Sequence, residues 1–332
     1  MGLIDNIFGF KDTIFLKETS SLQNKYDALC KLIKEYPNND NLKEEFFIVK
    51  KGIEGENEIK YQLSKANIGM YVLHDINLEY EDLKAQIDYI VITKYFCYFI
   101  ECKNLIGNIK VNDKSEFIRE YTFNNKKVKK GMYSPLRQVE AQRDVYKKIW
   151  NTRLSKNPII NSIKRLFAEN NFYDTHRVLV VASNRETILD TRYAPKDVKY
   201  KILKAENLVK QIQYDLNNYN KEDWTTKSDM EKWANTFLNI NIEDNTNYYE
   251  YYKNKYLKDD INNKELLRNE LIEFRNKRFK ELNIPAYYVF NNEELELLVD
   301  NKPKTVEELK KILTPVKVNI HGKEIIEIIS KY

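Results

Sequence analysis

The sequence predicts a mixed α/β domain followed by a small all-α domain. Between about residues 48 and 216, short apolar stretches alternate with longer segments of helical periodicity, as in a sheet packed against helices. Beyond residue 262 the apolar residues recur at helical spacing, and prolines interrupt them. A hydrophobic content of 42% and a net charge of only +5 fit a chain that buries real cores, and they permit a nucleic-acid partner without requiring one.

Residues 1–47 are expected to form a helical N-terminal extension, because apolar residues recur at helical spacing until Pro37 breaks the pattern. A second helix is expected over residues 42–63. It contains Gly52 and Gly55, which are unfavourable inside a helix and therefore suggest that its backbone packs closely against a neighbour.

The α/β domain is assigned to residues 48–216. A helix should begin at Pro135, since proline is favoured in the first turn, and run to about residue 150. A closing helix is expected over residues 205–216. The strand candidates, which are short and rich in apolar and β-branched residues, are residues 71–74, 86–93, 96–103, 109–111, 117–123, 177–182 and 199–203.

Residues 217–262 are polar and rich in Asn and Tyr, and we expect a helical connector there. Residues 263–332 should form several short helices, broken near Pro285, Pro303 and Pro315. The chain thus divides into an extension, an α/β domain, a connector and a small all-α domain.

The three cysteines are few and unpatterned, which favours free thiols in a reducing compartment. The three histidines show no ligand spacing that would build a zinc site with them. No apolar run approaches the roughly 20 residues that span a bilayer, and the first residues lack the basic start of a secretory signal. We therefore expect a cytoplasmic protein with no membrane partner.

The strongest chemical signal is Asp88 followed by Glu101 and Lys103. Along a strand, Glu101 and Lys103 share one face, and Asp88 reaches the same edge if its strand is the hairpin partner. Two carboxylates suit a hard cation such as Mg²⁺ or Mn²⁺, which polarises a phosphodiester and acidifies a bound water. A lysine beside them can stabilise negative charge on phosphorus.

The alternative reading of Glu101 and Lys103 is an ion pair on a solvated strand face, which is the usual meaning of an isolated Glu-x-Lys. Here the motif directly follows the apolar stretch Tyr98-Phe99-Ile100, so the charges stand where a buried strand emerges. Charges at such a place are rarer and more often functional.

These residues sit inside a longer resemblance. Five segments, in order and spacing, are similar to the nuclease-related domain (NERD) of the PD-(D/E)xK nuclease superfamily: Gly52-Ile53-Glu54-Gly55-Glu56, Tyr71-Val72-Leu73-His74-Asp75-Ile76, Ala85-Gln86-Ile87-Asp88, Phe99-Ile100-Glu101-Cys102-Lys103-Asn104 and Gly107-Asn108-Ile109. The resemblance covers roughly residues 48–215. It implies a restriction-endonuclease-like fold, with a central mixed sheet, flanking helices and a divalent-metal site.

By position in the family motif, Asp88 and Glu101 would be metal ligands and Lys103 the catalytic lysine. Glu56, on the helix before the sheet, matches the family's early glutamate and would orient a metal-bound water. The chain departs from the superfamily name at Ile87, where a proline would precede Asp88.

Gln138, Gln142 and Tyr146 lie four residues apart and so share one helical face. Their side chains are candidates for contacting a phosphate or a metal-bound water, and the resemblance supports Gln138 best. Gln142 and Tyr146 also resemble the glutamine–tyrosine motif of RecB-type nucleases. An ordinary polar helix face is the alternative.

Four lysines in a short run, expected to form a basic loop, are candidate contacts for DNA phosphates: Lys126, Lys127, Lys129 and Lys130. A basic loop that is merely solvated is the alternative.

Residues 264–331 resemble the HRDC domain, a small helical module of RecQ-type helicases and RNase D. The run Asn283-Ile284-Pro285-Ala286-Tyr287 and its downstream spacing carry the resemblance, which implies nucleic-acid binding or a regulatory contact. Thirteen Lys and Arg stand against twelve Asp and Glu in this segment, and Thr314-Pro315-Val316 replaces the family's glycine-rich hairpin. A protein-contact role is therefore an equal alternative to direct DNA binding.

The resulting hypothesis is a Mg²⁺- or Mn²⁺-dependent nuclease that hydrolyses DNA phosphodiester bonds in DNA processing, repair or defence. DNA is the expected partner, RNA is not distinguished from it, and a helicase or another DNA-processing protein is a candidate partner. The rivals are a catalytically silent DNA-binding protein and a scaffold that recruits a helicase. Since no base-reading motif is present, backbone recognition with little sequence preference is expected.

Overall fold

The computed structural model describes residues 10–152, 161, 172–219 and 225–332. The chain forms two compact units, Met1–Tyr248 and Tyr249–Tyr332. Each unit has its own hydrophobic core.

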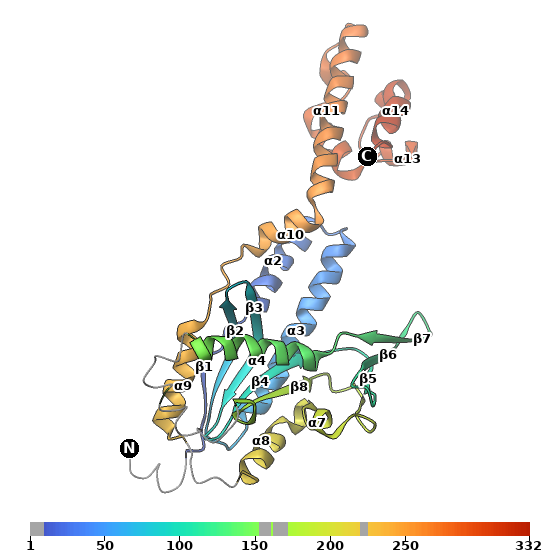
Figure 1. Ribbon diagram of the computed structural model, residues 1–332. Coiled ribbons are helices and arrows are strands. Elements are labelled where there is room, and N and C mark those ends of the chain that lie inside the picture. Colours follow the sequence, from blue (N-terminus) through green and yellow to red (C-terminus); the bar gives the residue numbers. More distant parts are fainter. Residues whose placement is uncertain (1–9, 153–160, 162–171, 220–224) are drawn as a thin grey trace. The chain divides into compact units, whose positions relative to one another are not determined.

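A six-stranded mixed sheet forms the centre of the first unit (Figure 1). Strand β3 is antiparallel to both of its neighbours, β2 and β4, whereas β1 pairs parallel with β2, β8 with β4 and β10 with β8. In sheet order the strands are β1 (Thr13–Lys17), β2 (Met70–Tyr80), β3 (Leu83–Ile92), β4 (Cys97–Lys103), β8 (His176–Ala182) and β10 (Ile202–Lys204). This confirms the mixed α/β class predicted from the sequence.

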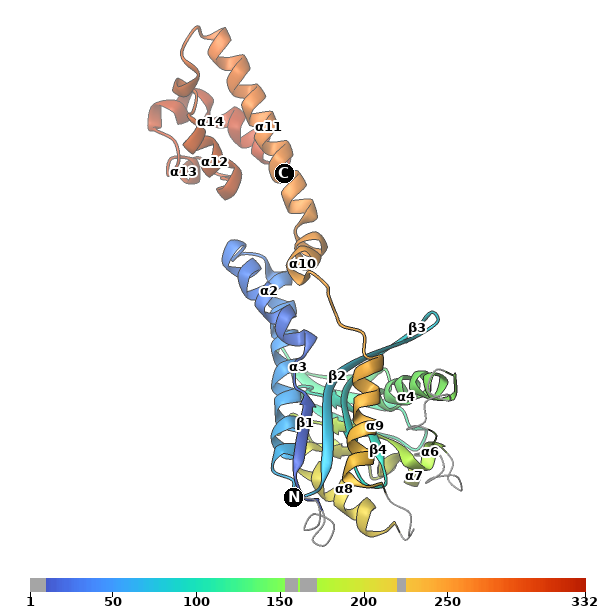
Figure 2. The same cartoon turned by 90° about the vertical axis from the view of Figure 1, so that its left-hand side faces the viewer.

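Helices cover both faces of this sheet (Figure 2). On one face α4 (Pro135–Thr152) and α9 (Lys227–Ile240) bury apolar side chains against the strands, and on the other α3 (Asp40–Ser64) and α8 (Leu208–Asn217) do the same. Successive residues of a strand point to opposite faces, so Cys97 and Phe99 of β4 join the α4 core while Tyr98 and Ile100 join the α3 core. The sheet is therefore buried on both sides.

A second, four-stranded sheet has the order β7–β6–β5–β9. The strands are β5 (Asn108–Val111), β6 (Phe117–Phe123), β7 (Lys126–Met132) and β9 (Leu189–Asp190). Asn124 and Asn125 join β6 to β7 with φ values of 47° and 60°, the left-handed pair that a two-residue hairpin turn requires. The lysine run at residues 126–130, expected to be a loop, is thus a strand.

The N-terminal segment contributes more than the helical extension expected for residues 1–47. Strand β1 pairs with β2 and completes one edge of the central sheet. Helix α2 (Ser21–Glu35) follows, with the Ser20 side chain accepting a hydrogen bond from the N–H of Leu22. Helix α3 begins at Asp40, capped by Asn39.

Part of the segment expected to be a connector, residues 217–262, lies in the core of the first unit. The side chains of Met230, Trp233 and Phe237 on α9 are fully or almost fully buried in the α4 core. Their spacing of three and four residues places them on one helical face. The compact first unit therefore runs to Tyr248, past the end of the α/β domain assigned at residue 216.

Four shorter elements complete the first unit: α6 (Phe172–Thr175), α7 (Lys196–Lys199), η1 (Ala205–Asn207) and the start of α10 (Tyr248–Tyr256). Residues 199–203 were expected to form one strand, but α7 ends at Lys199 and β10 begins only at Ile202.

The second unit is helical throughout, as predicted. Its core gathers Leu271, Phe290, Leu298, Leu309 and Ile325. Its elements are α11 (Lys258–Glu281), η2 (Ala286–Tyr288), α12 (Asn292–Asn301), α13 (Val306–Leu309) and α14 (Pro315–Ile329). Among the residues described in either unit, no helix has the length and apolar character needed to cross a membrane.

An uncharged histidine is buried among aromatic rings on the α4 side of the sheet. His176 stacks on Phe172 with 3.9 Å between ring centroids, and Trp150 and Trp233 present edges to it. Its Nε2 is buried and meets no hydrogen-bond partner in the part of the chain that the structure describes. Burial lowers the pKa of His176 to about 3, so the ring is neutral in the fold.

His176 should make the protein sensitive to mild acid. In the unfolded chain the imidazole takes up a proton below about pH 6.5, whereas the folded protein resists this until about pH 3. The contribution of neutral His176 to the free energy of unfolding is therefore fully present above pH 6.5. It is lost as the pH falls, by about 2 kcal/mol between pH 7 and pH 5. Urea unfolding at both pH values should show that His176→Phe removes this part of the acid loss. Equal pH dependence in the variant and the parent would contradict the assignment.

Candidate active site

The site lies where the central sheet divides between β3 and β4. Pairing of β2 with β3 continues to Tyr80 and Leu83, but the ladder between β3 and β4 ends at Tyr89 and Ile100. Beyond that pair, β4 stays with β8 as far as Lys103. The next positions in the register, Asp88 and Glu101, therefore face each other across the start of a fork.

At the fork, the Asp88 side chain accepts the backbone hydrogen bond that β3 no longer accepts from β4. The Asp88 carboxylate accepts a hydrogen bond of 2.7 Å from the N–H of Cys102, a donor directed to the side where β3 no longer pairs. A buried N–H without an acceptor would cost free energy, so this contact stabilises the separated strands and holds Asp88 against β4.

Both carboxylate oxygens of Glu101 have partners. Lys103 donates to Oε1 at 2.5 Å and Gln142 donates its Nε2 to Oε2 at 3.1 Å. Lys103 also donates to Oε1 of Gln138 at 3.2 Å. Glu101 is only 2% exposed, and its carboxylate is stabilised by the partly exposed ammonium of Lys103 and by the amide of Gln142.

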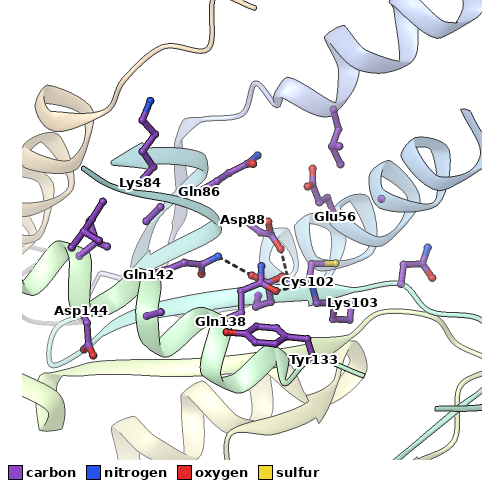
Figure 3. A pocket seen from close by; sticks show the side chains of 18 of the residues that line it. Glu56, Lys84, Gln86, Asp88, Cys102, Lys103, Tyr133, Gln138, Gln142 and Asp144 are labelled. Carbon is purple, nitrogen blue, oxygen red and sulfur yellow. Dashed lines mark hydrogen bonds and ion pairs between the residues drawn. The ribbon is translucent and has the colours of Figure 1, made fainter. Parts of the chain in front are cut away.

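These side chains line a cavity of about 740 Å³ (Figure 3). Gln138 and Gln142 reach it from α4, Asp88 from β3 and Lys103 from β4, and Glu56 approaches from α3 on the other side. The fork explains how helices from opposite faces of the sheet can contribute to one cavity.

Negative charge is in excess around Asp88. Desolvation raises the pKa of this carboxyl well above its usual range, and the charges of Glu101 and Glu56 raise it further. The N–H of Cys102 and the ammonium of Lys103 act in the opposite direction but do not cancel these effects. A bound cation would offset the same excess charge.

Glu56 is held by groups on its own, α3, side of the sheet. Its Oε2 accepts hydrogen bonds from Ser20 at 3.1 Å and from Nε2 of His74 at 2.7 Å. The His74 ring stacks on Tyr89 with 4.4 Å between centroids, and the Tyr89 hydroxyl donates to the carbonyl oxygen of Glu56. These contacts fix both the backbone and the carboxylate of Glu56.

Both ring nitrogens of His74 face oxygen acceptors. Nδ1 lies 3.2 Å from the carbonyl oxygen of Glu18, and Nε2 lies beside the carboxylate of Glu56. The two contacts hold the His74 ring, and with it the carboxylate of Glu56, in one orientation.

A glycine allows α3 to come close enough for Glu56 to reach the cavity. A Cβ on Gly55 would lie 2.6 Å from Cβ of Asn104 and 2.7 Å from Oγ of Ser183. A residue without a Cβ is therefore required where α3 packs against the residues that follow β4 and β8, which confirms the close approach predicted from the sequence.

Gly55→Ala should destabilise the protein by about 1–2 kcal/mol, because overpacking outweighs the gain in helix propensity. Gly52→Ala on the same helix is the matched control. Its new Cβ would meet only the far end of the Leu22 side chain, at 2.8 Å, which can rotate away. The free energies of unfolding in urea test the difference, and equal stability of the two variants would refute the packing argument.

Six residues chosen from the sequence line this one cavity: Glu56, Asp88, Glu101, Lys103, Gln138 and Gln142. Tyr146 does not line it. Its ring is fully buried, stacks on Phe237, and its hydroxyl accepts a hydrogen bond from Trp233. It is therefore a core residue and is not placed to contact a nucleic acid.

The four candidate lysines, Lys126, Lys127, Lys129 and Lys130, are exposed on β7 and are not among the residues that line the cavity. Lys129 is paired with Glu120 at 3.3 Å.

Sequence reasoning missed three residues at the site: Ser20, His74 and Tyr133. Ser20 and His74 hold Glu56 from other elements, and Tyr133 lines the cavity directly after β7. His74 belongs to one of the segments that carry the family resemblance, which is the one signal that could have drawn attention to it.

The oxygen atoms of the site suit a cation that also keeps water or substrate among its ligands. In the described parts of the chain, no three His, Cys, Asp or Glu side chains gather into a complete metal site. Mg²⁺, however, is usually held by one or two carboxylates, with water and substrate phosphate completing its shell. Asp88 and Glu101 provide two, and the buried Oε1 of Gln142 meets no hydrogen-bond partner among described residues. These residues fit such an ion.

The fold and site define a mixed α/β protein with two carboxylates and a lysine at a fork in its sheet, followed in the chain by a helical module. Residues 51–166 match the family model of the nuclease-related domain, NERD, and residues 265–329 match that of the HRDC domain. The chain therefore carries a nuclease-related domain and a C-terminal HRDC domain, as the sequence predicted. No curated protein and no solved structure gives a significant match.

Proposed function

We propose that the first unit is a divalent-metal-dependent nuclease that hydrolyses phosphodiester bonds of DNA, in DNA processing, repair or defence. The observation that carries the proposal is the arrangement of Asp88 and Glu101 on two diverging strands with Lys103 beside them, in a cavity open to a ligand. The match of residues 51–166 to a nuclease-related domain also supports it.

In this proposal Asp88 and Glu101 hold Mg²⁺ or Mn²⁺. The bound ion would polarise the phosphodiester and lower the pKa of a water ligand. The N–H of Cys102 holds Asp88 in place, and the amide of Gln142 holds Glu101.

Lys103 would act on the transition state. Its ammonium is placed by Glu101 and by Oε1 of Gln138, and it can turn toward a phosphate entering the cavity. There it stabilises negative charge that develops on the phosphoryl oxygens. Glu56, held in place by His74, lines the same cavity and would orient a metal-bound water there.

Metal binding gives the first test. Asp88→Asn and Glu101→Gln should each weaken Mn²⁺ binding by at least about tenfold, because each removes a charged ligand. Isothermal titration calorimetry measures this directly. Asp82→Asn, in the exposed turn between β2 and β3, is the control and should leave the affinity unchanged. Unaltered affinity in both site variants would sink the metal assignment.

Lys103→Ala separates an enzyme from a DNA-binding protein. If Lys103 acts on the transition state, the variant should bind DNA and Mn²⁺ nearly as well as the parent but cleave at least about a hundredfold more slowly. Lys103→Arg should rescue poorly, because a planar guanidinium places its donors differently from a compact ammonium. The measurement is single-turnover cleavage with saturating enzyme, beside equilibrium binding at several salt concentrations.

Lys84→Ala provides the matched control for that experiment. Lys84 lines the same cavity but is exposed and lies 3.9 Å from Glu79, away from both site carboxylates. Its loss should leave the single-turnover rate at saturation unchanged. Full cleavage by Lys103→Ala would refute the role of Lys103, and absence of cleavage by the parent on every DNA substrate would favour the binding protein.

The HRDC match suggests nucleic-acid binding by the second unit. Six of its thirteen basic residues between residues 264 and 331 form ion pairs with carboxylates: Lys264, Arg268, Lys277, Arg278, Lys317 and Lys331. The same segment has twelve Asp and Glu, so its net charge is only +1. We therefore propose that the second unit supports substrate or partner contact while the first unit holds the phosphodiester backbone.

A further inference from the structure

The hairpin of β6 and β7 has two faces of different chemistry. Residues that pair directly across antiparallel strands lie on the same face. The pairs Arg119–Lys130, Tyr121–Val128 and Phe123–Lys126 form one face, which we call the aromatic face. The pairs Glu120–Lys129 and Thr122–Lys127 form the other.

The aromatic face carries three positive charges and no negative charge. Among the residues that the structure describes, neither Lys126 nor Lys130 lies within ion-pair distance of a carboxylate. On the opposite face, Glu120 neutralises Lys129 at 3.3 Å. The alternation of the strand therefore places Lys126 and Lys130 on the aromatic face, and Lys127 and Lys129 on the face that carries Glu120.

Aromatic rings alternate with these charges. The Arg119 guanidinium lies over the Tyr121 ring, 4.6 Å from its centroid, and the Phe123 side chain is 62% exposed next to the turn. Exposed rings interleaved with cations provide stacking surfaces for unpaired bases together with contacts for phosphates. Bases stacked inside a duplex cannot use such rings.

The hairpin is attached to the catalytic strand at a fixed position. The segment after Lys103 is held against β6, because Arg119 Nε donates to the carbonyl oxygen of Ile106 at 2.8 Å. Gly107 passes so close that a Cβ there would lie 2.6 Å from Cβ of Tyr121. At the other end of the hairpin, Tyr133 follows β7 and lines the cavity. The hairpin is thus connected to the candidate active site through the segment after Lys103 and through Tyr133.

We propose that the aromatic face binds a single-stranded segment of nucleic acid and leads it to the cavity. Phe123 and Tyr121 stack on unpaired bases while Lys126 and Lys130 contact phosphates. This inference deepens the proposed nuclease function, on which it rests, by assigning a single-stranded polynucleotide as the substrate class. It requires no base-specific contact.

The test compares neighbouring residues on opposite faces. In fluorescence anisotropy with labelled oligodeoxythymidine and EDTA, Lys126→Ala should lower the slope of log affinity against log salt by about 0.7, the value for one phosphate contact on a single strand. Lys127→Ala removes the same charge from the other face and should leave the slope unchanged. Phe123→Leu, which keeps an apolar side chain but removes the ring, should weaken single-strand binding about tenfold and leave duplex binding unaltered.

Equal effects of Lys126→Ala and Lys127→Ala, or equal loss of single-strand and duplex binding in Phe123→Leu, would overturn the proposal in favour of a non-selective basic surface. Because EDTA prevents metal-dependent cleavage, the result does not depend on activity. A parent that binds as expected but never cleaves with Mn²⁺ would refute the nuclease function alone. A parent that cleaves while the two faces respond alike would refute the hairpin alone.

Discussion

The architecture of the site depends on one hydrogen bond, from the N–H of Cys102 to the carboxylate of Asp88. It occupies a backbone donor at the place where β3 leaves β4, so the sheet can open without leaving that N–H unsatisfied. The cost is electrostatic, since burial and the nearby charges of Glu101 and Glu56 raise the pKa of Asp88. An asparagine oxygen could accept the same hydrogen bond without that cost. The carboxylate at this position therefore lowers stability, and it would be useful only with the cation that we propose.

The opening of the sheet also explains why the site has two layers of support. From one face, α4 supplies Gln138 and Gln142, which hold Lys103 and Glu101. From the other, α3 supplies Glu56, which is itself held by Ser20 and His74. In a continuous sheet, the two faces would be separated by a layer of paired strands. At the fork the two faces meet, so side chains from α3 and from α4 line one cavity.

Local periodicity predicted the centre of the site, and long-range packing decided the rest. The period of two along β3 and β4 is a property of each strand, so the convergence of Asp88, Glu101 and Lys103 could be predicted. Tyr146 follows Gln142 by four residues, but each four-residue step rotates about 40° around the helix axis. Two steps after Gln138 the side chain therefore points into the core, although Lys148 of the same helix still lines the cavity. The core role of α9 was hidden because Trp233 and its apolar neighbours stand in a stretch of polar composition. His74 acts from a different element, a relation that no local pattern contains.

The alternation along β4 also limits how this protein can change in length. Its odd-numbered residues from Cys97 to Lys103 serve the α4 core and then the site, while Tyr98, Ile100 and Cys102 serve the α3 side. Inserting or deleting one residue within β4 would turn each following side chain to the opposite face of the sheet. Apolar core residues and the charged residues of the site would then both point to the wrong face. The turn at Asn124 and Asn125 does not pack against either face of the central sheet, because it is exposed and joins only two strands. Variation in chain length should accordingly be tolerated at the tip of the hairpin and excluded from the strand that carries Glu101 and Lys103.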